Sequence, residues 1–207
     1  MSFCAGARSM LERWQSCTRA LVGDKRGVAA IEFAIIAPLL LSLYFVTMEV
    51  SQGIETNKKV SRVGSMVADL VTQQQTIKKS EIDAIMKIGE SILQPYNRSV
   101  GKIVITAIEI TDEATPKVKV VWSRKLVNGV ASVDAPKEAP TTVPAALKIK
   151  GTFLIRVKSD LEYKPVITWA AESKPALGLA AAFDGISMSE TYYLRPRMSQ
   201  SIPCSDC

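Results

Sequence analysis

The sequence contains no histidine among its 207 residues. This absence removes the Ser-His-Asp and Cys-His routes for activating a nucleophile, and with them the commonest protein ligand for metals. The P-loop, the dinucleotide-binding fingerprint, the GxSxG elbow and the HExxH zinc motif are also absent. Composition leaves catalysis by carboxylates alone open, but nothing in the sequence marks a pair. The sequence therefore predicts a chain that is not an enzyme and that has no cofactor or metal site.

Cysteine is scarce, and the four cysteines form two groups at opposite ends of the chain. Cys4 and Cys17 precede a long apolar segment, whereas Cys204 and Cys207 form a CSDC motif at the C-terminus. A CxxC motif can close a disulfide, act in redox chemistry or supply half of a zinc site. Zinc needs two more ligands, and redox activity favours the start of a helix. We rank a terminal disulfide first, unpaired thiols second and chemistry last.

Charge is nearly absent from residues 28–50, where only Glu32 and Glu49 are charged. A membrane-spanning helix needs about 20 mostly apolar residues, because each adds about 1.5 Å across hydrocarbon about 30 Å thick. The alternative is a cleaved secretory signal, but such signals have apolar regions of about 7–15 residues and end in small residues. The segment TMEVSQG does not supply that ending. We therefore predict one transmembrane helix over residues 28–50.

The charge before this helix predicts its orientation. Residues 1–27 carry five basic and two acidic side chains. The positive-inside rule places such a segment in the cytoplasm. The prediction is a cytoplasmic basic leader (1–27), a transmembrane helix (28–50) and an exported domain (51–207). The formal net charge of +6 does not gather into a basic face, so we expect the membrane as a partner and no nucleic acid.

Apolar spacing predicts two helices in the first half of the exported part. Four residues at three- and four-residue steps continue the first helix to about residue 71: Val60, Val63, Val67 and Leu70. A second helix is predicted to start at Ser80, whose side chain would cap it, with Asp83 in the place of the glutamate of a capping box.

The second half has the patterns of strands. Residues 103–110 predict a central strand, and three more strands are predicted at 118–123, 153–158 and 188–194. Val118, Val120 and Trp122 are expected on one buried face, and Asn128-Gly129 marks a turn. Residues 131–146 and 164–185 are predicted as loops. Loops 129–148 and 164–185 are the expected contact surfaces.

These elements together predict an α+β fold. A long helix and a sheet each have one apolar face, and neither buries that face alone. We therefore expect the long N-terminal helix to pack on an antiparallel sheet of about four strands, with one modest core in the exported part.

The segment that starts at Gly27 carries the most specific signal. Glu32 is an acid inside an apolar span, which costs roughly 2.5–3.5 kcal/mol at the helix centre on insertion scales. One reading is that Glu32, near the membrane edge, stabilises the positive end of the helix dipole. The neighbouring residues favour a second reading. A glycine follows Lys25-Arg26 and precedes the pair Glu32-Phe33 by five residues.

This spacing is similar to the processing site of type IV prepilins, above all the Flp/Tad class with its G-x-x-x-x-E-[FY] signature. The whole segment GVAAIEFAIIAPLLLSLYFVTMEV resembles the N-terminal signature of the TadE family. That family's mid-span proline and terminal glutamate correspond to Pro38 and Glu49. The C-terminal segment YYLRPRMSQSIPCSD resembles the end of that family more loosely. The arrangement of helix and sheet is pilin-like.

The resemblance implies that a prepilin peptidase cuts between Gly27 and Val28 at the inner membrane of a bacterium. It implies that Glu32, beside Phe33, then pairs with the new α-amine of Val28 in a neighbouring subunit. Pro38 removes one helical hydrogen bond and would kink or loosen the span.

The chain is much longer than a major Flp pilin, so the resemblance implies a minor pilin or pseudopilin. Its partners would be the peptidase, other pilin-like subunits and the pilus assembly platform. The alternative is a non-polymerising single-pass protein whose exported domain binds a partner or ligand.

Overall fold

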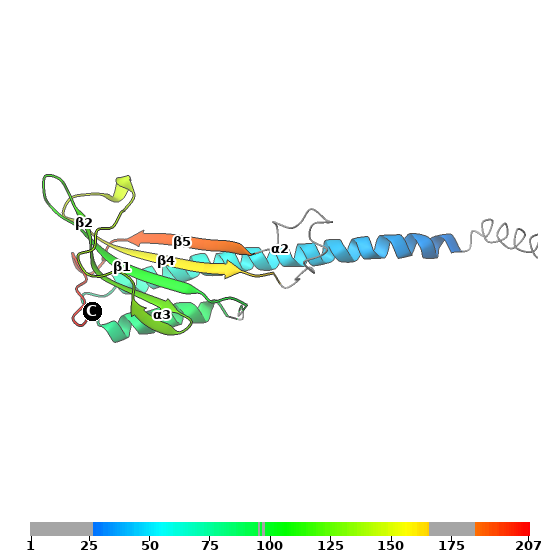
Figure 1. The fold of residues 1–207 in the computed structure, drawn as a ribbon, viewed down its shortest axis with the longest axis horizontal. Coiled ribbons are helices and arrows are strands. Elements are labelled where there is room, and N and C mark those ends of the chain that lie inside the picture. Colours follow the sequence, from blue (N-terminus) through cyan, green and yellow to red (C-terminus); the bar gives the residue numbers. More distant parts are fainter. Residues whose placement is uncertain (1–26, 95, 97, 166–184) are drawn as a thin grey trace, which may run out of the picture. The chain divides into compact units, whose positions relative to one another are not determined.

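The computed structural model describes residues 27–94, 96, 98–165 and 185–207 (Figure 1). The chain divides into two compact units, Met1–Met48 and Glu49–Cys207. Helix α2 (Val28–Thr72) contributes residues to both units. The predicted leader up to residue 26, with Cys4 and Cys17, and most of the predicted 164–185 loop lie outside the described residues.

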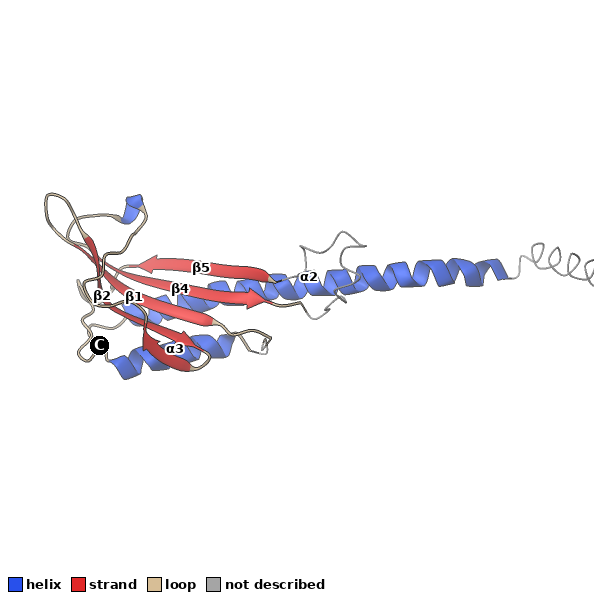
Figure 2. Ribbon diagram, in the orientation of Figure 1, coloured by secondary structure: helices blue, strands red, loops and turns tan. Residues whose placement is uncertain are grey.

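The second unit combines two helical segments with one antiparallel sheet. Within its described residues, the elements after α2 are helix α3 (Lys79–Ile92), strands β1 (Lys102–Ile110), β2 (Val118–Val127) and β3 (Val130–Val133), the 3-10 helix η2 (Ala145–Leu147), β4 (Phe153–Tyr163) and β5 (Ile186–Leu194). The strand order is β3-β2-β1-β4-β5 (Figure 2). The α+β prediction, with a helix packed on an antiparallel sheet, is confirmed. The sheet has five strands where about four were expected.

The buried face of α2 follows the predicted spacing in all but its last position. Val60, Val63 and Val67 are buried in the main core. Leu70 is half-buried, and Val71 is fully buried in its place. Helix α2 ends at Thr72, close to the predicted end.

Two glycines set the close approach of the helices to their neighbours. A Cβ added at Gly64 would lie 2.7 Å from Cδ2 of Tyr192 on β5. A Cβ added at Gly89 on α3 would lie 2.8 Å from Cγ2 of Val67. Glycine at these positions therefore lets α2 meet the sheet and α3 meet α2 without a gap.

The predicted cap of the second helix is wrong by two residues, because the N-cap is Lys78 where Ser80 was expected. Helix α3 begins at Lys79, ahead of the expected cap Ser80. The backbone amide of Lys79 donates to Oδ1 of Asp206 in the C-terminal tail at 2.7 Å. The backbone amide of Lys78 donates to Oε2 of Glu81 at 2.8 Å, so the helix start has one distant and one local acceptor. Asp83 forms an ion pair with Arg124, at 2.6 Å between Oδ2 and the guanidinium. Local sequence could not show Asp206 or Arg124 as partners of this helix, because both lie far along the chain.

Strand β3 corrects the prediction of a loop over residues 131–146. Asn128 and Gly129 have φ values of 51° and 73°, which suits a two-residue hairpin turn with left-handed residues. The predicted turn is confirmed, and β3 returns from it to pair with β2. The loop prediction holds only between Val133 and η2.

A β-bulge in β2 corrects the predicted face of that strand. The register against β1 shifts between Trp122 and Val120, leaving Val121 as an extra residue. Trp122 therefore packs in the main core, whereas Val118 packs with Ile108 in a second cluster. The simple alternation expected of Val118, Val120 and Trp122 is wrong, because the bulge moves the strand's residues from one face to the other.

Two hydrophobic clusters stabilise the second unit. The main core contains the buried faces of α2 and α3 and the facing side of the sheet. The smaller cluster contains Ile108, Ile110 and Leu154, with Val143 and Leu147 packed on it. The segment around η2 therefore covers part of the sheet face that the helices leave open.

Candidate functional site

The apolar part of α2 in the first unit has no cover among the described residues. Phe33, Ile35 and Leu39 are 72%, 68% and 66% exposed. None of the most apolar stretch of α2 is buried inside the structure. A core helix of a globular domain would bury a stripe of such residues. The described chain thus has one N-terminal helix long and apolar enough to cross a membrane.

Gly27 directly precedes this helix and is not required by the fold. A Cβ built at Gly27 meets no described atom within 4 Å, and its φ lies outside the left-handed region. Neither packing nor backbone conformation of the described chain therefore selects glycine there.

The other motif residues lie on the exposed surface of α2. Glu32 and Phe33 are both exposed, and Glu32 makes no hydrogen bond or ion pair within the described part of the chain. Val28 is one helical turn from Glu32, so the two lie at the same end of α2. The helix continues through Pro38, and the expected kink stays a prediction.

Glu49, the first residue of the second unit, has a buried side chain. Its exposed fraction is 5%, and Oε1 accepts a hydrogen bond from the Tyr163 hydroxyl at 2.5 Å. A buried carboxylate is costly unless it is paired or hydrogen-bonded. Tyr163, at the end of β4, therefore fixes the position of Glu49 against the sheet.

An arginine and a second tyrosine surround this contact. The rings of Tyr96 and Tyr163 are stacked with centroids 5.5 Å apart, and the Arg98 guanidinium lies 5.3 Å from the centre of the Tyr96 ring. Arg98 donates to the Lys164 carbonyl at 2.8 Å and to Oε1 of Gln52 at 3.1 Å. The cluster thus joins α2, the segment before β1 and the end of β4. Sequence reasoning missed it, because no local spacing connects these positions.

The Tyr163 contact predicts a dependence of stability on alkaline pH. Burial, and then the hydrogen bond to Glu49, raise the pKa of Tyr163 to about 12. Because the pKa of an unfolded tyrosine is about 10, the fold favours the neutral hydroxyl. That contribution is complete below pH 10 and is lost as pH rises towards 12. Urea unfolding of the full chain in detergent is expected to show this loss.

The Tyr163→Phe variant is the test of that dependence. It lacks the ionisable hydroxyl, so its free energy of unfolding should fall less than that of the wild type between pH 10 and 12. Tyr193→Phe, at a half-buried tyrosine on β5, is the control. Equal losses in Tyr163→Phe and the wild type would show that this ionisation is not linked to folding.

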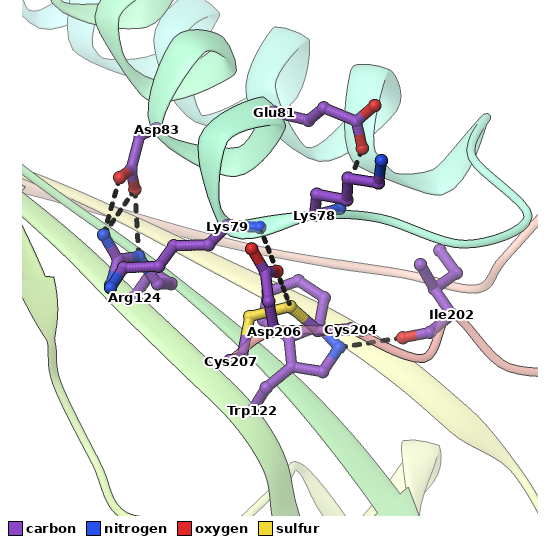
Figure 3. The surroundings of a disulfide bond; sticks show 10 residues. All are labelled: Lys78, Lys79, Glu81, Asp83, Trp122, Arg124, Ile202, Cys204, Asp206 and Cys207. Carbon is purple, nitrogen blue, oxygen red and sulfur yellow. Dashed lines mark hydrogen bonds and ion pairs between the residues drawn. A yellow bond between two sulfur atoms is a disulfide. The ribbon is translucent and has the colours of Figure 1, made fainter.

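The structure joins Cys204 and Cys207 in a disulfide at the start of α3 (Figure 3). Asp206, between them, accepts the hydrogen bond from Lys79 that caps the helix. Oxidised cysteines offer no thiolate, so the cluster of Cys204, Asp206 and Cys207 is not arranged to bind a metal in this state. These residues belong to the second unit and not to the motif around Gly27.

The residues before the disulfide tie the tail to the core. Ile202 is fully buried, and its carbonyl accepts a hydrogen bond from Nε1 of Trp122 at 2.8 Å (Figure 3). Arg197 forms an ion pair with Asp69 on α2 at 2.6 Å. The C-terminal segment after β5 therefore contacts α2, α3 and β2 and holds them together.

Comparison with known families connects the exposed helix to an established group. Residues 27–68 match the family model described as TadE-like protein. These residues are a TadE-like domain. No curated protein and no solved structure matches the chain.

The match confirms the resemblance of the segment that starts at Gly27. It begins at Gly27, includes Glu32, Phe33 and Pro38, and ends at Ala68 on the buried face of α2. TadE-like proteins are a structural family of pilus assembly and not an enzyme family. An N-terminal hydrophobic helix in such a domain is consistent with a pilin-like component of Tad pilus assembly.

Proposed function

We propose that the chain is a minor pilin-like or pseudopilin-like structural component of a Tad/Flp-type pilus or secretion assembly. Residues 28–50 anchor it in the inner membrane of a bacterium, with the leader cytoplasmic and residues 51–207 exported. The observation that carries the proposal is the exposed apolar half of α2 within a TadE-like domain. Such a surface is stable only in lipid or against other helices.

Processing of the chain by a prepilin peptidase is the first step of this function. The peptidase supplies the catalysis and cuts between Gly27 and Val28, and the chain is its substrate. The open space around Gly27 supports this step, because the described fold gives no other reason for glycine. A small residue lets the backbone enter a narrow active site.

Assembly through the helix is the second step. Cleavage creates an α-amine at Val28, and that amine pairs with Glu32 of a neighbouring subunit. Glu32 has no partner within the described residues, and an acid in an apolar layer costs least when it is paired. Phe33, which is 72% exposed, packs beside this pair in the same interface. Pro38 leaves one carbonyl of α2 free of its helical partner and lets the helix adapt to its neighbours.

Gly27→Phe is expected to block processing without disturbing the domain. The side chain has space in the described fold but not in a narrow peptidase site, and a small misplacement of a reacting bond costs on the order of 100-fold in rate. Intact mass of the chain, expressed with an active prepilin peptidase, should show only the uncut form.

The matched control is Gly53→Ala, at a glycine inside α2. An added Cβ there meets Tyr163 at an ordinary 3.8 Å, so this variant should fold and be cut normally. Undiminished cleavage of Gly27→Phe would contradict the processing step.

A further inference from the structure

A groove lies within the second unit where the first turns of α2 after Glu49 face the ends of β4 and β5. Its volume is about 620 Å³. Val50, Gly53 and Ile54 form the apolar part of the helix wall, and Tyr163 and Ile186 belong to the opposite wall. Cavities of roughly 300–1,000 Å³ with mostly apolar walls and a few polar groups are typical ligand sites.

The apolar side chains on both walls of the groove are exposed. Val50 and Ile54 are 56% and 53% exposed, and Ile186 across the groove is 49% exposed. Gly53 contributes no side chain between Val50 and Ile54, and a Cβ added there would lie 3.8 Å from the buried Tyr163 ring. The chain thus keeps an apolar slot open.

The charged groups of the groove favour an anion as part of its ligand. Lys58 lines the groove and makes no ion pair within the described part of the chain. Glu49 lines it as well, but its carboxylate is 5% exposed and accepts the Tyr163 hydrogen bond. The accessible charge is therefore the ammonium of Lys58.

The position of the groove along the sequence identifies the occupant. The apolar run 28–50 ends where the groove begins, and each headgroup layer of a bilayer is about 5–7 Å thick. The four helical steps from Val50 to Ile54 rise about 6 Å along α2, which matches that layer. Side chains of a helix lean towards its N-terminus, so the Lys58 ammonium reaches back towards the same level.

We propose that this groove binds a glycerophospholipid of the leaflet that residues 28–50 reach on the exported side. The start of an acyl chain packs against Val50, Ile54 and Ile186, and Lys58 binds the phosphate. The site rests on the proposed membrane insertion of the chain, but not on its cleavage or polymerisation. It would fix the depth and rotation of the exported domain at the membrane surface.

The test is native mass spectrometry of the full chain in mild detergent, titrated with dioleoylphosphatidylglycerol. Gly53→Leu fills the slot with a side chain and should lower lipid retention by about tenfold. Gly53→Ala adds only one methyl group and should retain the lipid. Lys58→Glu, an exposed substitution, should weaken retention of phosphatidylglycerol more than that of phosphatidylethanolamine.

Four outcomes would overturn the proposal in distinguishable ways. Equal retention by the wild type and Gly53→Leu would mean that the lipid lies elsewhere on the helix. A dimer lost in Gly53→Leu would assign the groove to a second copy. The wild type could resist extraction from membranes by carbonate and still retain no lipid. That result would contradict the lipid site but not the proposed function. Extraction of the wild type by carbonate would remove the anchor on which both depend.

Discussion

Glu32→Ala is expected to leave membrane insertion intact and to abolish most assembly. Removing an acid from an apolar helix makes insertion easier. In the assembled state, however, the variant leaves the Val28 amine of a neighbouring subunit in an apolar layer without its partner. Breaking a buried ion pair costs about 3–5 kcal/mol, which corresponds to a loss of at least about 100-fold in association. The measurement is the amount of chain recovered in sheared pili or cross-linked oligomers, relative to the amount in membranes.

Glu55→Ala is the matched control for this experiment. Glu55 is also an acid on α2, but it is 68% exposed and pairs with Lys59 of the same helix. Its removal should change assembly little, because exposed pairs contribute about 0–1 kcal/mol. Normal incorporation of Glu32→Ala would show that Glu32 does not pair subunits.

Asp83→Ala is expected to have the largest effect on the stability of the exported domain. Arg124 is 3% exposed, and its guanidinium donates three hydrogen bonds to the carboxylate of Asp83 at 2.6–2.9 Å. In this variant, the buried Arg124 guanidinium lacks these three hydrogen bonds. The expected loss is about 3 kcal/mol in the free energy of unfolding, at the lower end for buried pairs because Asp83 itself is 22% exposed.

Urea unfolding of the full chain measures this loss, and two further variants define it. Glu113→Ala breaks an exposed pair with Lys117 and should cost less than about 1 kcal/mol. The double variant Asp83→Leu with Arg124→Leu replaces both charges by apolar groups and should recover much of the stability. A loss in Asp83→Ala no larger than that in Glu113→Ala would contradict the structural role of the pair.

The parts of the fold that the sequence predicts correctly are those decided by neighbouring residues. The spacing of Val60, Val63 and Val67 is a property of one helix, and Asn128-Gly129 encodes its turn by the backbone freedom of those two residues. Strand β1 is predicted as central because its residues are apolar on both faces.

The errors arise where distant residues decide the local structure. One acceptor at the start of α3 is Asp206, which is 127 positions from Lys79. Glu49 and its partner Tyr163 are 114 positions apart. Strand β3 has only four residues, and pairing with β2 decides its structure although a proline-rich segment follows it. The residue spacing within each of these segments does not indicate its distant partner.

Some residues of the candidate site are identified from the sequence, and others only from the folded structure. Gly27, Glu32 and Pro38 are read from their spacing and from the family they resemble, since the described chain gives them no partners. The Glu49, Tyr163 and Arg98 cluster is visible only in the folded domain. The sequence signal for it is an acid that ends an apolar run, which also suits a residue at a membrane edge.

The mature N-terminus tests the proposed function most directly. The chain is purified from the membranes of a bacterium with an active prepilin peptidase, and its N-terminal sequence and intact mass are determined. A pilin-like component should start at Val28, with the sequence VAAIEF and without the leader. A full-length chain that starts at Met1 would contradict processing and would favour a single-pass protein that does not polymerise.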